Sequence, residues 1–127
     1  MNEKTLHKQV CEYIRYQYPT AIFNSDLAGS MKLTIGQAVQ IKNLRSSKGF
    51  PDIVIYEPKG DYHGLFIELK VEGVKLFKKD GITFVSDHIY EQNIMIMDLR
   101  RKGYFADFAI GFDQAKARID WYMNLKP

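Results

Sequence analysis

The stretch Leu65-Phe-Ile-Glu-Leu-Lys-Val71 decides the centre of the fold of this 127-residue chain. Its side chains alternate, so a β-strand would carry aliphatic residues on one face and Phe66, Glu68 and Lys70 on the other. A strand this hydrophobic is expected to be central in a sheet. Burial of a carboxylate and an ammonium there is costly unless the two groups are paired with each other or used for chemistry.

A second acid, Asp52, begins the segment Asp52-Ile-Val-Ile-Tyr56, which we interpret as a buried strand because it is apolar and β-branched. If the two strands are neighbours, Asp52 and Glu68 meet at one point. Two carboxylates there would repel each other unless a divalent cation lay between them. Lys70 would point to the same place, where it could orient a water or stabilise charge on a phosphate. This arrangement suits phosphodiester hydrolysis with Mg²⁺ or Mn²⁺; the alternative is a Glu68–Lys70 ion pair with Asp52 as a strand-start cap.

The rest of the chain predicts an α/β fold around these strands. Helices are expected over residues 3–18, from a capping box at Thr34-Ile-Gly-Gln37 to about Arg45, from Ser86 or Asp87 to Lys102, and from an Asp113 cap to near Met123. Strands are expected over residues 21–24, 52–56, 65–71 and 104–110, with a hairpin arm pairing 76–77 with 82–85. The order α-β-α-β-β-(hairpin)-α-β-α predicts one domain over residues 1–127, a small mixed sheet flanked by helices.

The charges are balanced but unevenly distributed. Eighteen Lys and Arg residues against fifteen Asp and Glu give a net charge of +3, too mild to prove a nucleic-acid partner. The stretch Leu27–Pro51, however, contains several bases and no acid, and further basic clusters lie at 75–79 and 100–102. Such clusters either track a phosphate backbone or are simply solvated. The candidate DNA contacts are Lys42, Arg45, Lys48 and Lys75.

Composition excludes several other classes of protein. The hydrophobic fraction of 46% and the charged fraction of 26% are those of a globular protein. No apolar run is long enough to span a bilayer, and the N-terminal MNEKTLHKQV lacks the core of a signal peptide. The single Cys11 cannot form an internal disulfide, which fits a reducing compartment. We therefore expect a cytoplasmic protein without a membrane partner.

Two motifs together resemble a known nuclease signature. Gly49-Phe-Pro-Asp52 followed by Phe66-Ile-Glu-Leu-Lys70 is similar to the PD-(D/E)xK motif. The wider pattern, with Gln92 in the following helix, resembles the VRR-Nuc (virus-type replication–repair nuclease) family from about Glu3 to Tyr122. This resemblance implies a restriction-endonuclease-like core, metal-dependent DNA cleavage, and a bacterial or viral (phage) origin.

Polar residues within the apolar stripes of two helices are further candidates. Gln92 is either a core glutamine bonded to backbone or an active-site contact, and the resemblance favours the active site. The family pattern also has an acid in the first helix. Glu12 lies opposite the apolar stripe and should face water, whereas Glu3 falls within the stripe, so we expect Glu3 to complete the metal shell. His7, beside the same stripe, is expected to be structural or solvated.

The leading hypothesis is a stand-alone DNA endonuclease in which Asp52, Glu68 and Glu3 bind Mg²⁺ or Mn²⁺, Lys70 is catalytic and Gln92 assists. A homodimer would supply two active sites for two DNA strands. The helix 87–102 is apolar nearly all round, so its second side needs cover from a partner subunit or from the arm 74–85. A symmetric dimer would suit a four-way junction, as the resemblance implies. The alternative is a non-catalytic DNA-binding or assembly subunit with the same fold.

Overall fold

The computed structural model describes residues 1–26 and 31–126, so the first residues of the acid-free stretch, 27–30, lie outside the described part. The elements are α1 (Glu3–Gln17), β1 (Phe23–Ser25), α2 (Ile35–Asn43), β2 (Ile53–Ile55), β3 (Leu65–Lys70), α3 (Asp87–Arg101), β4 (Phe105–Ile110) and α4 (Gly111–Met123). The sheet order is β1-β2-β3-β4, antiparallel except for the parallel pair β3–β4. The predicted α/β class with a small mixed sheet is confirmed.

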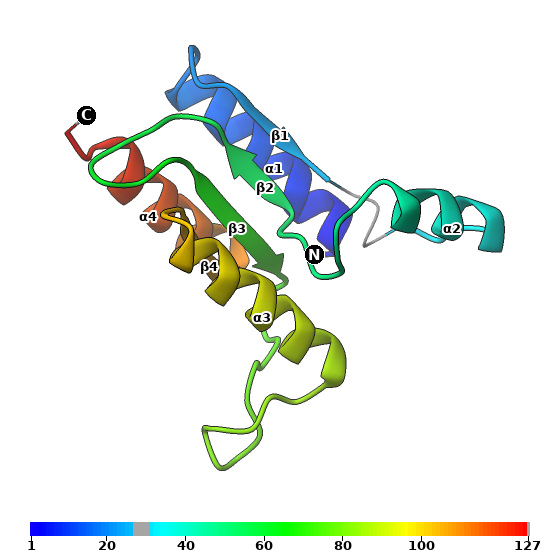
Figure 1. The fold of residues 1–127 in the computed structure, drawn as a ribbon. Coiled ribbons are helices and arrows are strands. Elements are labelled where there is room, and N and C mark those ends of the chain that lie inside the picture. The colour runs from blue at the N-terminus through cyan, green and yellow to red at the C-terminus, as the bar shows by residue number, and fades with distance from the viewer. Residues whose placement is uncertain (27–30, 127) are drawn as a thin grey trace.

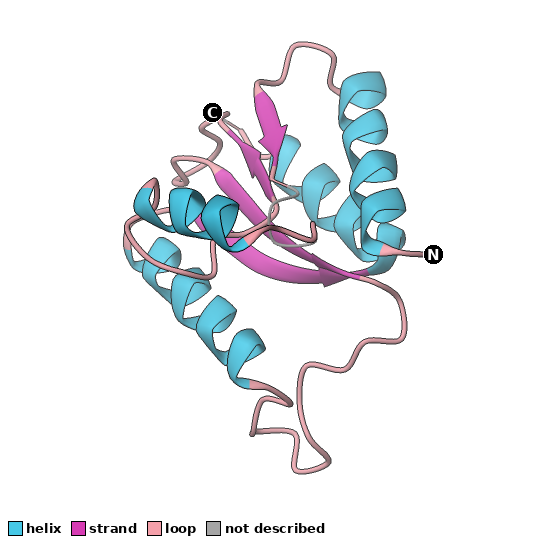
Figure 2. Ribbon diagram, turned by 90° about the vertical axis from the view of Figure 1, so that its right-hand side faces the viewer, coloured by secondary structure: helices cyan, strands magenta, loops and turns pink. Residues whose placement is uncertain are grey.

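Helices cover both faces of the sheet (Figures 1 and 2). The alternation of β3 explains this: Leu65, Ile67 and Leu69 are buried in a core shared with α1 and α4. On the opposite face Phe66 packs against the cluster built by α3 and β4. The face of β3 that carries Glu68 and Lys70 therefore lies toward α3, as the strand pattern predicts.

The start of α4 differs from the prediction. Asp113 was expected to cap this helix, but the N-cap is Ile110, whose side chain cannot accept a hydrogen bond, and Asp113 lies in the first turn. Strand β4 passes into α4 without a linker, because Gly111 adopts a φ of 83° that favours glycine. Gln114 Oε1 accepts the N–H of Ile110 itself at 2.9 Å, while no side chain of the N-cap bonds to the first turn of the helix. The predicted capping box at Thr34 and the Ser86 cap of α3 are confirmed.

Two segments project from the body in Figure 1, the arm 74–85 below α3 and helix α2 at the right. The arm is a loop with one bridge, Phe77 to Phe84, rather than a pair of full strands. Its Phe84 packs on the α3 cluster, so the arm covers part of α3, while Tyr90, Ile94 and Met97 stay exposed. Helix α2 has no buried residue. Within the described chain, no helix is both long and apolar enough to cross a membrane.

Candidate active site

The ends of β2 and β3 bring the two predicted acids and the lysine together. Ile53 pairs with Ile67 in antiparallel register, so Asp52, which precedes β2, lies beside the following residues of β3. Asp52 Oδ2 accepts the backbone N–H of Leu69 at 2.8 Å, which fixes the acid against that strand. Glu68 and Lys70 are only 4% and 7% exposed, and Lys70 Nζ lies 3.6 Å from Glu68 Oε1.

Helix α3 closes this site from the other side. Buried Gln92 donates from Nε2 to Glu68 Oε1 at 2.6 Å, and the same nitrogen lies 3.2 Å from His88 Nε2. The turn before Asp52 packs on the same helix, since a Cβ at Gly49 would lie 2.9 Å from the Glu91 carbonyl oxygen. Gly49 also has a φ of 83°, so both space and backbone conformation favour glycine there.

The first helix supplies a contact that the sequence analysis missed. His7 is not solvated: its ring is 2% exposed, with Nδ1 3.1 Å from Ser25 Oγ and Nε2 3.6 Å from Asp52 Oδ2. A Ser25 hydroxyl that donates to Nδ1 leaves the Nε2–H facing the Asp52 carboxylate. The available signal was spacing, because His7 follows Glu3 by one helical turn on the same face.

These side chains enclose a small cavity of about 90 Å³. Its lining residues come from α1, from the loops on either side of α2, from β3 and from α3: Glu3, Asp26, Arg45, Gly49, Phe50, Asp52, Glu68, Lys70, His88 and Gln92. Glu3 lies at this cavity while Glu12 is exposed, so the predicted phase of the first helix is confirmed. Asp26, which the sequence analysis did not single out, forms an ion pair with Arg45 at the wall.

The electrostatics of the cavity centre on Glu68. Burial, and then the negative charge of Asp52, raise the pKa of Glu68 to about 9, while the Lys70 ammonium acts in the opposite direction. Burial and the neighbouring Asp52 therefore favour the protonated form of Glu68. Glu68 Oε2 and Gln92 Oε1 are buried and have no hydrogen-bond partner among the described residues. Buried oxygens of this kind usually have a partner, so the cavity is built for one more positively charged or donating group.

The donor set fits a hard divalent cation. Asp52 and Glu68 offer carboxylate oxygens, which Mg²⁺ and Mn²⁺ prefer, and a cation would satisfy Glu68 Oε2. Over residues 1–26 and 31–126, no three His, Cys, Asp or Glu side chains converge closely enough to form a ready-made site. The fit therefore rests on two carboxylates, with Glu3 at the edge of the same cavity. Mg²⁺ commonly binds through one or two carboxylates and keeps several waters.

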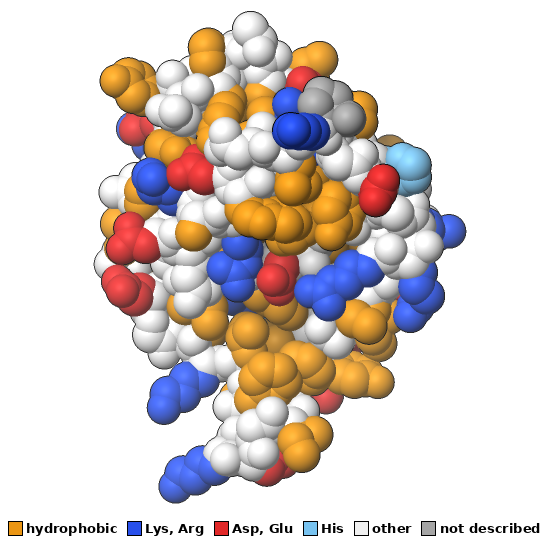
Figure 3. Space-filling model, turned by 90° about the vertical axis from the view of Figure 1, so that its left-hand side faces the viewer, with side chains coloured by type: hydrophobic (Ala, Val, Ile, Leu, Met, Phe, Trp, Pro, Cys, Tyr) orange, Lys and Arg blue, Asp and Glu red, His pale blue; other side chains and the backbone are white. Residues whose placement is uncertain are grey.

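The predicted DNA contacts fall into two groups. Lys42, Arg45 and Lys48 line a second cleft beside the cavity. Lys75 is exposed on the arm and lines neither cavity. The side of the molecule away from α2 shows acidic and basic side chains intermixed with hydrophobic ones (Figure 3). The bases that follow or belong to α2 lie next to the acids of the site, with Glu91 in the same cleft and Asp26 paired with Arg45.

No family model matches the chain, and no curated protein does. Among solved structures, a "VRR_NUC domain protein" is similar over 99% of this chain and 91% of its own, with a TM-score of 0.69 and 22% sequence identity. This similarity establishes a shared fold over nearly the whole chain. The resemblance that the two motifs indicated is thereby confirmed at the level of the fold.

Proposed function

We propose that this chain is a Mg²⁺- or Mn²⁺-dependent endodeoxyribonuclease that hydrolyses phosphodiester bonds in DNA. The observation that carries the proposal is the meeting of Asp52, Glu68 and Lys70 in one cavity, where Glu68 Oε2 lacks a hydrogen-bond partner among the described residues. A merely structural Glu68–Lys70 pair would not require a second carboxylate beside it. The fold shared with a VRR_NUC domain protein supports the same reading.

Each residue has a distinct task in this proposal. Asp52 and Glu68 hold the cation, with Glu3 completing its shell. When bound, the cation would screen the phosphate charge and make the attacking water more acidic. Lys70, held near Glu68, orients that water and stabilises the charge that develops on the phosphate oxygens. Gln92 fixes the orientation of Glu68 through its 2.6 Å hydrogen bond.

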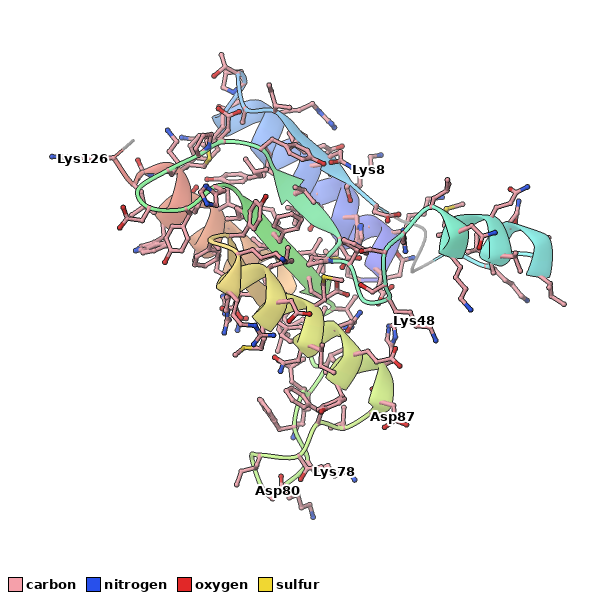
Figure 4. The ribbon with its side chains drawn as sticks, in the orientation of Figure 1. Lys8, Lys48, Lys78, Asp80, Asp87 and Lys126 are labelled. Carbon is pink, nitrogen blue, oxygen red and sulfur yellow. The ribbon has the colours of Figure 1, made fainter. Side chains whose placement is uncertain are left out.

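DNA would approach from the side of α2. Lys42, Arg45 and Lys48 contact the backbone next to the site, and Lys75 on the arm contacts it further away. In Figure 4, Lys48 lies between α2 and the start of α3, while Lys78 at the tip of the arm lies on the far side of α3. The two projections therefore flank the beginning of α3, and a DNA molecule in contact with both would pass the site.

A homodimer is part of the proposal, because one chain carries one such site and a duplex has two strands. The exposed apolar side chains of α3 offer a surface for a second copy: Tyr90, Ile94 and Met97. Two sites related by a two-fold axis would suit a four-way junction. Sedimentation of the protein, with and without substitutions on this face, tests the dimer separately from the chemistry.

The test is incubation with linear duplex, single-stranded, flap and four-way-junction DNA in the presence of EDTA, Mg²⁺, Mn²⁺ or Ca²⁺. We expect cleavage with Mg²⁺ or Mn²⁺ and none with EDTA. Asp52→Asn should abolish cleavage and weaken cation binding. Full activity of this variant in EDTA would end the metal hypothesis. Binding to DNA without cleavage under every condition would instead favour the non-catalytic alternative, a DNA-binding or assembly subunit with the same fold.

A further inference from the structure

A second cleft opens directly beside the catalytic cavity. It has a volume of about 570 Å³, against about 90 Å³ for the cavity itself. The two share Arg45, Gly49 and His88 as lining residues, so a molecule seated in the cleft would lie against the wall of the catalytic cavity. The volume falls in the range of about 300–1,000 Å³ that is typical of small-molecule sites and has room for one nucleotide.

The lining of this cleft has two kinds of side chain. Leu33, Ala38 and Ile41 make an apolar wall on the α2 side. Lys42 and Lys48 add positive charge to the same cleft, and among the described residues that line it Glu91 is the one acid. An apolar wall beside ammonium groups fits a flat, uncharged ring that is attached to phosphates. Sites for single-stranded nucleic acid commonly combine a basic groove with aromatic side chains, and in this cleft aliphatic side chains take the place of the aromatic ones.

The apolar wall is not explained by the folding of α2. The helix has no buried residue, and it begins with its own capping box, formed by Thr34 and Gln37. It stands apart from the sheet in Figure 1. Arg45, just after α2, forms an ion pair with Asp26 and links this segment to the body. The apolar side chains that face the cleft therefore remain available to a ligand.

We propose that this cleft binds the base of an unpaired nucleotide next to the phosphate that is cut. The inference rests on the proposed function and names its substrate more closely. A base inside a duplex has both faces covered by its neighbours, so an apolar wall gains contact only with a base that has left the stack. Lys42 and Lys48 hold the phosphates on either side of that nucleotide. The protein thus selects DNA that already contains an unpaired base, at a junction or elsewhere, over DNA in which every base is paired.

The decisive comparison uses three fluorescently labelled duplexes of one sequence. The first is fully paired, the second carries one extra unpaired adenine, and the third carries an abasic site in place of that adenine. Binding is measured by anisotropy in Ca²⁺ and again in EDTA. We expect the adenine bulge to bind about fivefold more tightly than the abasic bulge, the lower end of what an aromatic contact to a base contributes, because the wall here is aliphatic. Equal affinity for the two bulges would overturn the proposal.

Two neighbouring substitutions on α2 locate the effect. Ala38→Gln places a longer polar side chain in the cleft, and we expect it to remove the difference between the two bulges. Val39→Gln makes the same change at an exposed position that does not line the cleft and should leave the difference intact. Both positions are exposed, so neither change removes core packing. A difference that survives Ala38→Gln, or that only Val39→Gln removes, would contradict the assignment of the base to this cleft.

The same samples separate this inference from the nuclease itself. If the base preference is present but no DNA is cut with Mg²⁺ or Mn²⁺, the proposed reaction fails and the base-binding cleft stands. If cleavage occurs without base preference, the nuclease stands and the cleft assignment fails. Failure to bind any DNA would reject both. Loss of a dimer on sedimentation of Ala38→Gln would show that a second copy of the chain occupies the cleft, which also overturns the proposal.

Discussion

The cavity around Glu68 and helix α2 lie side by side but are built in opposite ways. In the cavity, polar side chains are buried: Glu68, Lys70 and Gln92 are at most 7% exposed. On α2, apolar side chains are exposed, with Ile35 at 87% and Val39 at 51%. Both regions depart from the usual distribution of polar and apolar residues, and departures of this kind concentrate where a protein binds or reacts.

The difference between the two regions predicts which property a substitution in each of them should change. The cavity holds its side chains through short contacts to one another, so a change there should alter the chemistry or cation binding. Helix α2 contributes nothing to the buried core, so a change there should alter DNA binding while the fold and the reaction remain. Variants in the two regions should therefore fail in different assays, and five predictions test this separation.

The largest effects are expected from Asp52→Asn and Lys70→Met, which should both stop cleavage but for different reasons. Lys70→Met keeps most of the side-chain volume and removes the charge. Its cleavage rate should fall about 10²–10³-fold, the typical loss of one donor to the transition state. Ca²⁺ should still bind it, and more tightly because a competing charge is lost, whereas Asp52→Asn should lose both Ca²⁺ binding and cleavage. If Lys70→Met cuts DNA at an undiminished rate, Lys70 has no catalytic role and serves only as the ion-pair partner of Glu68.

His7→Asn should have the next largest effect. This variant tests whether the buried contact between His7 and Asp52 strengthens cation binding. His7 touches Asp52 and not the cavity centre, so it is a positioning residue. Loss of such a partner typically weakens metal binding about 10–100-fold. Mn²⁺ affinity measured by calorimetry should fall, excess Mn²⁺ should restore the rate, and His7→Gln should be the milder variant. If Mn²⁺ affinity is unchanged while thermal stability falls, His7 serves packing alone.

The basic side of α2 should give a smaller effect that appears in affinity. Changing Lys42, Arg45 and Lys48 together to Gln should weaken binding to every DNA and flatten the salt dependence by up to about three phosphate contacts. Arg45 already pairs with Asp26 and should contribute least. The control is Lys126→Gln, since Lys126 lies at the opposite end of the molecule from Lys48 in Figure 4. If the salt dependence of DNA affinity is unchanged in the triple variant, these three residues do not contact DNA, and the arm around Lys75 is the next surface to test.

A smaller difference should separate the two acids of α1. Glu3 lines the cavity and Glu12 is exposed, although both lie on one helix. Glu3→Gln should lower the cleavage rate and weaken cation binding, and Glu12→Gln should leave both near the wild-type values. Rates measured over a range of Mg²⁺ concentrations distinguish a weaker cation site from slower chemistry. If Glu12→Gln lowers the cleavage rate and Glu3→Gln does not, Glu3 is not part of the site.

The sequence could predict those parts of the site that depend on local periodicity. Strand alternation placed Glu68 and Lys70 on one face of β3, and helical phase directed Glu3 rather than Glu12 toward the sheet. In both cases the residue and its neighbours along the chain carry the information. The capping box of α2 is of the same kind, because both partners lie within four residues.

Contacts between distant segments could not be read in this way. The approach of His7 to Asp52 depends on how α1 packs on the sheet, and the pair Asp26–Arg45 depends on the path of a loop. The missing cap at Asp113 follows from a strand that passes straight into a helix at Gly111. The exposure of Val39 on α2 could not be predicted from the sequence either, because an apolar residue in a helix normally indicates a buried face.

Glu68 connects the chemistry of the cavity to the stability of the protein. Its pKa is raised from 4.5 to about 9 in the metal-free fold, chiefly by burial and then by the charge of Asp52. Between those two values the unfolded chain has an ionised Glu68 and the folded protein a protonated one. Folding then takes up a proton, so the contribution of Glu68 to stability is present below its unfolded pKa and is lost as the pH rises toward its folded pKa.

The smallest effect, a shift of a few degrees in Tm, should therefore be a pH-dependent stabilisation by Glu68→Gln. Gln resembles the protonated carboxyl group in shape and carries no charge, so it removes the cost that the buried Glu68 incurs as the pH rises. In EDTA the variant and the wild type should melt at similar temperatures near pH 5, and the variant should melt higher near pH 8, as measured by calorimetry.

Ca²⁺ should stabilise the wild type at the higher pH and have little effect on the variant. Glu12→Gln, on the exposed side of α1, should follow the wild type throughout. If the melting temperature of Glu68→Gln depends on pH as that of the wild type does, Glu68 is not the group that titrates. If Ca²⁺ stabilises the variant as much as the wild type, Glu68 does not bind the cation.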